Sequence, residues 1–149
     1  MKKLSLIIAT LLLSMPIFAS CNDNDDQTIN YNDTPTGVKE FITSHFANAG
    51  VRYVEKDWDS YDVHLKNGFE IDFNLQGKWT EVDANRADMP QSIIDLLPAK
   101  IMEYLNGNYT NRRIESISNR TYGYKIELTG NPDVEIIFDN EGNFQRFDD

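Results

Sequence analysis

The side chains that could take part in chemistry lie at every second position of two short stretches. The first stretch, YDVHLKNGFEIDF from residue 61, contributes Asp62, His64, Glu70 and Asp72. The second, YKIELTGNPDVEIIF from residue 124, contributes Glu127 and Glu135. Residues at this spacing share one face of a β-strand. Because carboxylates catalyse acid–base steps only where a pocket shifts their pKa, a solvent-facing row of this kind favours binding of a partner over catalysis.

The sequence lacks the other residue combinations that enzymes use. It holds two histidines, His45 and His64, and no Cys, His or carboxylate cluster has the spacing of zinc ligands. It has no G-x-S-x-G motif and no glycine-rich phosphate loop. The segment DNEGN, 139–143, lacks the spaced acidic series of a calcium loop and is interpreted as a hairpin turn. We therefore expect no enzymatic activity, no metal site and no cofactor.

An aromatic residue marks a second candidate feature. Trp58 lies in KDWDSY, a tight connection between two predicted strands. Its ring either folds back over the sheet or stands free as a binding anchor, because aromatic residues at exposed tips contribute much of the energy of interfaces. Tyr53 on the preceding strand and Tyr122 near the corresponding later turn would extend such an anchor.

Two copies of one unit must position these side chains. Apolar residues in 35–46 and 98–109 recur at helical spacing, and each stretch begins near a proline. The following residues alternate with period two and turn at Gly68, Gly77 and Gly142, which predicts antiparallel hairpins. The predicted fold is α+β: a tandem repeat of a helix plus a four-stranded antiparallel sheet, with the helices packed on one sheet face. Repeat 1 covers residues 35–85 and repeat 2 covers 86–149, in one compact body.

The N-terminal residues indicate export. A basic start, an apolar run and small residues in 1–20 are typical of a signal peptide. Cys21 follows directly, is the only cysteine, and resembles the lipidated residue of a bacterial lipobox. Residues 21–34 are polar and acidic, which predicts a flexible tether. We expect an outer-membrane lipoprotein, facing the periplasm or the cell surface and held in the membrane through lipid on Cys21.

The charge balance restricts the partner. The chain has 14 basic and 24 acidic residues, a net charge of −10. Loss of Lys2 and Lys3 with the signal leaves 12 basic residues against 24 acidic ones, a net charge of −12. Nucleic acid is excluded as an expected partner, because binding it requires a basic surface. An acidic surface instead favours a basic protein or peptide.

The repeated pattern resembles a known family. A proline-started helix followed by YDVHLKNGFEIDFNLQGKW, and again by YKIELTGNPDVEIIFDNEGNF, is similar to the PepSY-like, beta-lactamase-inhibitor-like lipoproteins of Bacteroidetes over residues 35–149. The resemblance implies tandem helix-plus-four-strand units, and the family name implies protein binding or protease inhibition. The function predicted is a non-enzymatic binding protein that modulates a peptidase or another protein. The alternative is a structural or sensory component of a cell-envelope assembly.

Overall fold

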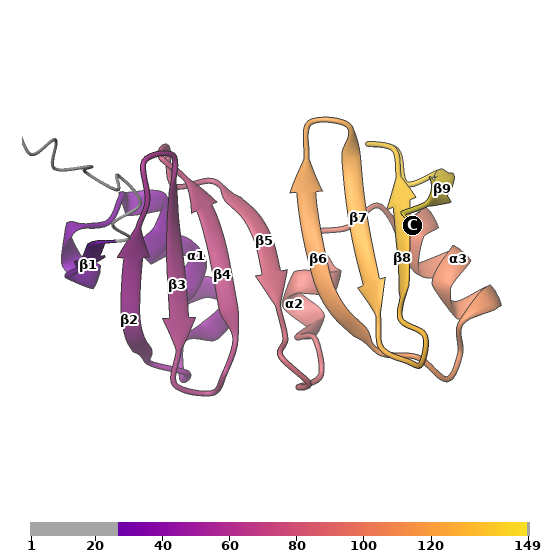
Figure 1. Cartoon of the computed structure of the whole chain (residues 1–149), viewed down its shortest axis with the longest axis horizontal. Coiled ribbons are helices and arrows are strands. Elements are labelled where there is room, and N and C mark those ends of the chain that lie inside the picture. Colours follow the sequence, from indigo (N-terminus) through magenta and orange to yellow (C-terminus); the bar gives the residue numbers. More distant parts are fainter. Residues whose placement is uncertain (1–26, 149) are drawn as a thin grey trace, which may run out of the picture.

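The described residues form one antiparallel sheet, and the helices lie behind it in the view of Figure 1. The computed structural model describes residues 27–148, so the predicted signal peptide, Cys21 and residues 21–26 of the predicted tether lie outside the described residues. The class is α+β, as predicted, and the sheet has nine strands in chain order (Figure 1). The elements are β1 (Gln27–Ile29), η1 (Tyr31–Asp33), α1 (Thr36–Phe46), β2 (Val51–Lys56), β3 (Ser60–Leu65), β4 (Glu70–Asn74), β5 (Trp79–Asp83), α2 (Gln91–Ile94), α3 (Ala99–Asn108), β6 (Ile114–Arg120), β7 (Gly123–Leu128), β8 (Val134–Phe138) and β9 (Phe144–Phe147).

The structure corrects the predicted tether over residues 27–34. Strand β1 pairs with β2, with Ile29 opposite Val54. The η1 turn follows, and the Thr34 hydroxyl donates to the Tyr31 carbonyl at 2.8 Å. Ile29 and Tyr31 pack against the core, so two apolar side chains in a polar stretch are enough to bind this segment to the sheet. The polar composition of the stretch gave no indication that these two side chains would pack against the core.

Helix α1 contacts the apolar face of the first strands. The helix follows Pro35, whose ring fixes the φ angle of that residue. Its buried residues Val38, Ile42 and Phe46 lie along one stripe. The Phe41 ring meets Phe73 of β4 edge-on at 5.5 Å and stacks on Trp79 of β5 at 5.9 Å. In Figure 1 the helix lies behind β2–β4.

Helix α3 makes the corresponding contacts with the last strands. It follows Pro98 and buries Ile101 and Leu105. The Tyr104 ring meets Phe138 of β8 edge-on at 5.4 Å and stacks on Phe144 of β9 at 5.1 Å. In each half of the molecule, apolar side chains of the helix therefore contact apolar side chains of the strands.

Two glycine turns bring hairpins against the helix starts. Gly77 and Gly142 have φ values of 77° and 83°, a region that side chains other than glycine rarely adopt. A Cβ at Gly77 would lie 2.9 Å from Cβ of Pro35, and one at Gly142 would lie 2.8 Å from Cβ of Pro98. Both predicted hairpin turns are confirmed, with Gly77 N–H donating to Asn74 O at 2.8 Å and Gly142 N–H to Asp139 O at 3.0 Å.

The junction between β5 and β6 makes the sheet continuous. Val82 lies opposite Ile117, and both are fully buried. The connection between these strands contains α2, whose Ile93 is also fully buried in the same core. No helix within residues 27–148 combines the length and apolar character that crossing a membrane requires.

Candidate functional site: the acidic sheet face

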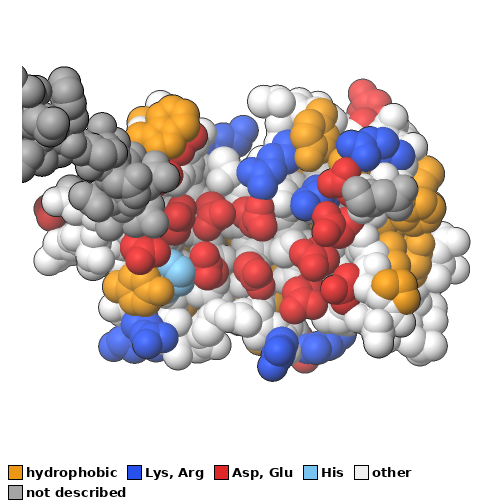
Figure 2. Space-filling model, in the orientation of Figure 1, with side chains coloured by type: hydrophobic (Ala, Val, Ile, Leu, Met, Phe, Trp, Pro, Cys, Tyr) orange, Lys and Arg blue, Asp and Glu red, His pale blue; other side chains and the backbone are white. Residues whose placement is uncertain are grey.

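The face of the sheet away from the helices carries the carboxylates that the sequence singled out. Strand pairing places Glu55 opposite Asp62, Asp62 opposite Asp72, and Asp72 opposite Glu81. These four residues form a line across β2–β5, which we call the acidic row. Figure 2 shows the band of acidic side chains on this face. Like charges directly opposite each other destabilise a sheet, so the row holds electrostatic energy that a cationic partner would relieve.

Asp72 lies at the centre of the acidic row and differs most from an ordinary carboxyl group. Its pKa is raised to about 7, chiefly by burial and then by the neighbouring carboxylates Asp62, Glu81 and Glu70, while Arg120 acts in the opposite direction. The group is therefore partly protonated near neutral pH. A positive charge placed over the row would favour its ionised form.

His64 lies between two carboxylates in the adjacent line of the same face. Its ring nitrogens are 3.3 Å from Glu55 Oε2 and 3.3 Å from Glu70 Oε2, and its ring stacks on Tyr53 at 4.2 Å. Burial raises the pKa of Glu70, and His64 lowers it. His64 was singled out from the sequence as one of the candidate residues, and the structure gives it two acidic partners.

Tyr53 does not extend the Trp58 tip, contrary to the prediction. Its strand register sets it opposite His64, well along β2 from the turn that contains Trp58. The alternation of β2 accounts for this, because Tyr53 and Glu55 face the polar side on either side of buried Val54. Tyr53 belongs to the acidic face and covers one side of the histidine ring.

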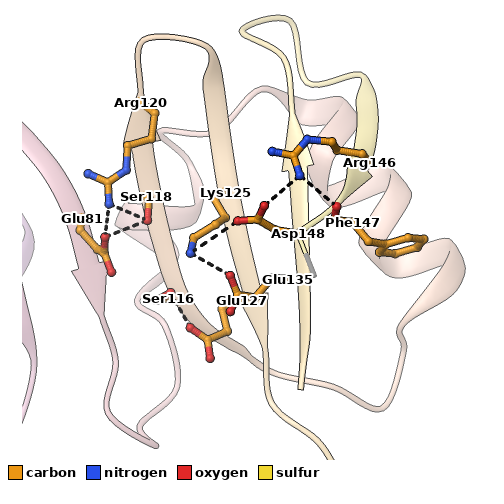
Figure 3. A network of polar contacts seen from close by, with 10 residues as sticks. All are labelled: Glu81, Ser116, Ser118, Arg120, Lys125, Glu127, Glu135, Arg146, Phe147 and Asp148. Carbon is orange, nitrogen blue, oxygen red and sulfur yellow. Dashed lines mark hydrogen bonds and ion pairs between the residues drawn. The ribbon is translucent and has the colours of Figure 1, made fainter. Parts of the chain in front are cut away.

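Basic side chains of β6 and β7 pair with carboxylates of this face (Figure 3). Arg120 donates to Glu81, the β5 end of the acidic row, at 2.5 Å, and Lys125 donates to Glu135 at 2.8 Å. Glu127 lies opposite Glu135 and accepts from the Ser116 hydroxyl at 3.2 Å. Burial raises the pKa of Glu127, and the hydrogen bond from Ser116 opposes it.

The negative charge is therefore concentrated over β2–β5. Besides the acidic row, this region carries Glu70 opposite His64 and Asp83 opposite Glu70. The residues in these two lines include no lysine or arginine. The arrangement favours a cationic ligand over the first half of the face and gives it a polar boundary at β6.

Trp58 stands out from the β2–β3 turn. Its side chain is 80% exposed, which excludes the alternative that the ring folds back over the sheet. The turn is held by a hydrogen bond of 2.6 Å from the Trp58 N–H to the Asp57 side chain. Tyr122 is 50% exposed in the β6–β7 turn, at the same end of the sheet (Figure 1).

Several residues of this surface were missed from the sequence. Leu75, 40% exposed, lies in the β4–β5 turn, and the pairing of Ser60 with Asn74 brings that turn beside the Trp58 turn. Glu55, Glu81 and Asp83 also face the polar side. Alternation around the buried residues of β2 and β5 could have identified them. An irregularity in the pairing of β4 with β5 interrupts that period.

The carboxylates form lines across strands without converging on a point. Within residues 27–148, no group of three or more His, Cys, Asp or Glu side chains is placed to hold a metal ion. The segment 139–143 is a turn, in which the Asp139 side chain accepts from the N–H groups of Glu141 at 3.0 Å and Asn143 at 2.8 Å.

Sequence comparison identifies the family. The model described as "Putative beta-lactamase-inhibitor-like, PepSY-like" matches residues 22–70 and 59–146. The chain belongs to this PepSY-like family. The resemblance drawn from the repeated pattern is thus confirmed. No curated protein matches the PepSY-like chain significantly.

Solved structures of similar proteins come from Bacteroides. A "putative calcium-regulated periplasmic protein" from Bacteroides thetaiotaomicron is 29% identical with a TM-score of 0.74, over 84% of this chain and 98% of that one. A periplasmic protein of unknown function from Bacteroides vulgatus is 32% identical with a TM-score of 0.73, over 83% and 99%. A third, from the DUF2874 family of the same species, is 31% identical with a TM-score of 0.72, over 85% and 98%.

Proposed function

We propose that this PepSY-like protein is an exported, lipid-anchored binding protein that holds a basic protein or peptide and catalyses no reaction. The acidic row carries the proposal, because four carboxylates oppose one another across adjacent strands, with Arg120 contacting the one at the β5 end, Glu81. Export is supported by the N-terminal signal pattern and by the periplasmic description of the relatives. Inhibition of a hydrolase is the mode that the family description suggests.

Charge and an aromatic anchor contribute to binding in different ways. An acidic face steers a basic partner and raises its association rate, and this effect weakens with salt over a Debye length of about 8 Å. Trp58, 80% exposed at the tip of the same sheet, supplies apolar area. Its loss is expected to cost on the order of 2 kcal/mol of binding free energy if it lies at the centre of the interface.

The same proposal includes the repeat organisation. The two halves are taken as copies of one unit, each a helix plus four strands with the helix on the apolar face. The matching ring stacks of Phe41 with Trp79 and Tyr104 with Phe144 support it, as do the glycine turns against Pro35 and Pro98.

The decisive experiment begins with capture of a partner from cell-envelope extract by the full-length protein. A single stoichiometric partner supports a binding module, whereas recovery only with large envelope complexes supports the structural or sensory alternative. Affinity for that partner is then measured at several salt concentrations, with and without calcium, because one relative is described as calcium-regulated.

Matched variants locate the interface. The joint change Glu70→Gln and Asp72→Asn should lower affinity by about tenfold, which corresponds to about 1.4 kcal/mol, and should reduce the salt dependence. The control is Glu40→Gln with Glu103→Gln, because both residues are exposed on helices and the number of carboxyl groups removed is the same. Equal effects of the two pairs would remove the acidic face as the interface, and turnover of a substrate by the purified protein would overturn the non-enzymatic proposal.

A further inference from the structure

The last strand of the sheet has an uncovered outer edge. Strand β9 pairs with β8, and no other strand among residues 27–148 pairs with it. Every residue of β9 is exposed, including Phe144 at 39% and Phe147 at 46%. Exposed strand edges carry backbone donors and acceptors that can pair with another chain, and proteins usually protect them. Two aromatic side chains at such an edge require an explanation.

Strand β5 occupies the same place in the first half of the molecule, and its outer edge is covered. Ile71 lies opposite Val82 as Ile136 lies opposite Phe147. Both strand pairs shift register one step further along, where Phe73 meets Trp79 and Phe138 meets Phe144. Position by position, Phe147 therefore corresponds to Val82.

The cover on β5 is an antiparallel strand of the same chain. Ile117 of β6 lies opposite Val82, and Val82 is fully buried there. At β9 the corresponding residue remains half exposed. The fold itself thus shows which kind of element completes this edge: one extended strand, antiparallel, with an apolar side chain opposite Phe147.

The backbone of Phe147 is directed to the open edge. Asp148 N–H donates to Glu135 O at 3.0 Å, and alternation in an antiparallel ladder then points the N–H and C=O of Phe147 away from β8. The Phe147 carbonyl accepts from Nη1 of Arg146 at 3.2 Å, and the same nitrogen contacts Asp148 at 2.9 Å (Figure 3). A flexible side chain of the strand occupies the position that an incoming N–H would take.

The charge around the edge selects the occupant. A hollow of about 280 Å³ beside the end of β9 is lined by Tyr109, Val134, Phe147 and the carboxylates of Asp133, Glu135 and Asp148. Lys125 contacts Glu135 and Asp148, and Arg146 contacts Asp148, so two basic groups face three carboxylates at this hollow. The remaining excess of negative charge favours a cationic segment. It disfavours a second copy of this chain, which carries a net charge of −10.

We propose that β9 accepts an extended basic segment of another protein as an added antiparallel strand, with an apolar residue over Phe147 and basic residues toward the hollow. Addition of a strand to a sheet edge gains affinity from main-chain hydrogen bonds and selectivity from alternate side chains. The site is at the β9 edge of the sheet, and strands β6–β8 separate it from the acidic row on β2–β5 and from the β2–β3 turn that contains Trp58. Its test is therefore independent of the function proposed above.

The probe is a peptide copied from the strand that covers β5. The capped sequence NRRIESISNRT, residues 111–121, contains three arginines and one glutamate. Ala84 N–H donates to Glu115 O at 2.9 Å, so ladder alternation also directs the N–H of Ile117 toward β5 and that of Ser118 away from it. N-methylation at the Ile117 position removes a pairing group, and N-methylation at Ser118 provides a matched control.

The full-length, isotope-labelled protein is titrated with each peptide while its amide NMR signals are followed. The expected result is movement of the β9 signals, about tenfold weaker binding of the peptide methylated at Ile117, and unchanged binding of the peptide methylated at Ser118. Phe147→Glu should abolish the effect. Arg146→Gln should strengthen it several-fold, and Arg52→Gln, with the same loss of charge, should strengthen it less.

Four results would overturn the proposal. The first is that the β9 signals do not move at millimolar peptide. The second is that the two methylated peptides bind equally. The third is that the moving signals lie on β2–β5, which would indicate binding to the acidic face or exchange with β6. In the fourth, the protein alone forms a dimer that Phe147→Glu dissociates, which would make a second copy the occupant.

Discussion

Replacement of Asp72 by asparagine should stabilise the protein and remove much of its pH dependence above acidic pH. The pKa of Asp72 is raised from 3.8 to about 7, chiefly by burial and then by the carboxylates around it. The folded state therefore holds this proton more tightly than the unfolded chain does. Between about pH 4 and pH 7 the folded state binds more protons, so the free energy of unfolding falls as pH rises through this window.

The size of the effect follows from the difference in proton affinity. A pKa raised from 3.8 to about 7 corresponds to about 4 kcal/mol, at about 1.4 kcal/mol for each tenfold change. Asp72 is partly accessible to water, and salt screens its neighbours, so an observed effect of about 1–2 kcal/mol is expected. Asparagine keeps the shape of the side chain and cannot ionise. The variant should therefore gain stability near pH 8 and little near pH 4.

Urea unfolding followed by circular dichroism, at a series of pH values from about 4 to about 8, measures this difference. Glu40→Gln is the control, because Glu40 is exposed on α1 and the change removes the same charge from the chain. Asp72→Asn should reduce the fall in the free energy of unfolding toward high pH, and Glu40→Gln should leave that fall unchanged. Parallel curves for Asp72→Asn and the wild type would refute the argument that burial and the acidic row together raise this pKa.

Three further outcomes are expected. Mass spectrometry should find lipid on Cys21, and Cys21→Ala should move the protein out of the membrane fraction; an unmodified, soluble wild type would contradict this. Gly77→Ala should cost about 1–3 kcal/mol, because the turn has a φ of 77° and a Cβ would clash with Pro35, whereas Gly107→Ala, with open space around it, should not destabilise. A fragment ending at Asp83 should lack cooperative thermal unfolding, because its Val82 would lose the cover of β6; a native-like transition would show independent halves.

Local periodicity determined much of the acidic face from the sequence alone. Alternation placed Asp62, Glu70 and Asp72 on one side of their strands, and the structure brings these residues together on that side. The turns at Gly77 and Gly142 were likewise readable, because positive φ is a local requirement of the backbone. Both properties depend on residues that are neighbours along the chain.

The tertiary structure alone decided which strands meet and what remains uncovered. Pairing of β5 with β6 joins the halves into one sheet, and the register of β2–β5 aligns four carboxylates so that Asp72 has neighbours that raise its pKa. The place of β1 at one edge, the exposure of Trp58 and the open edge at Phe147 were equally beyond the sequence pattern. Period two fixes the side of a strand on which a residue lies, but register and coverage depend on contacts between segments far apart in the chain, which no local pattern encodes.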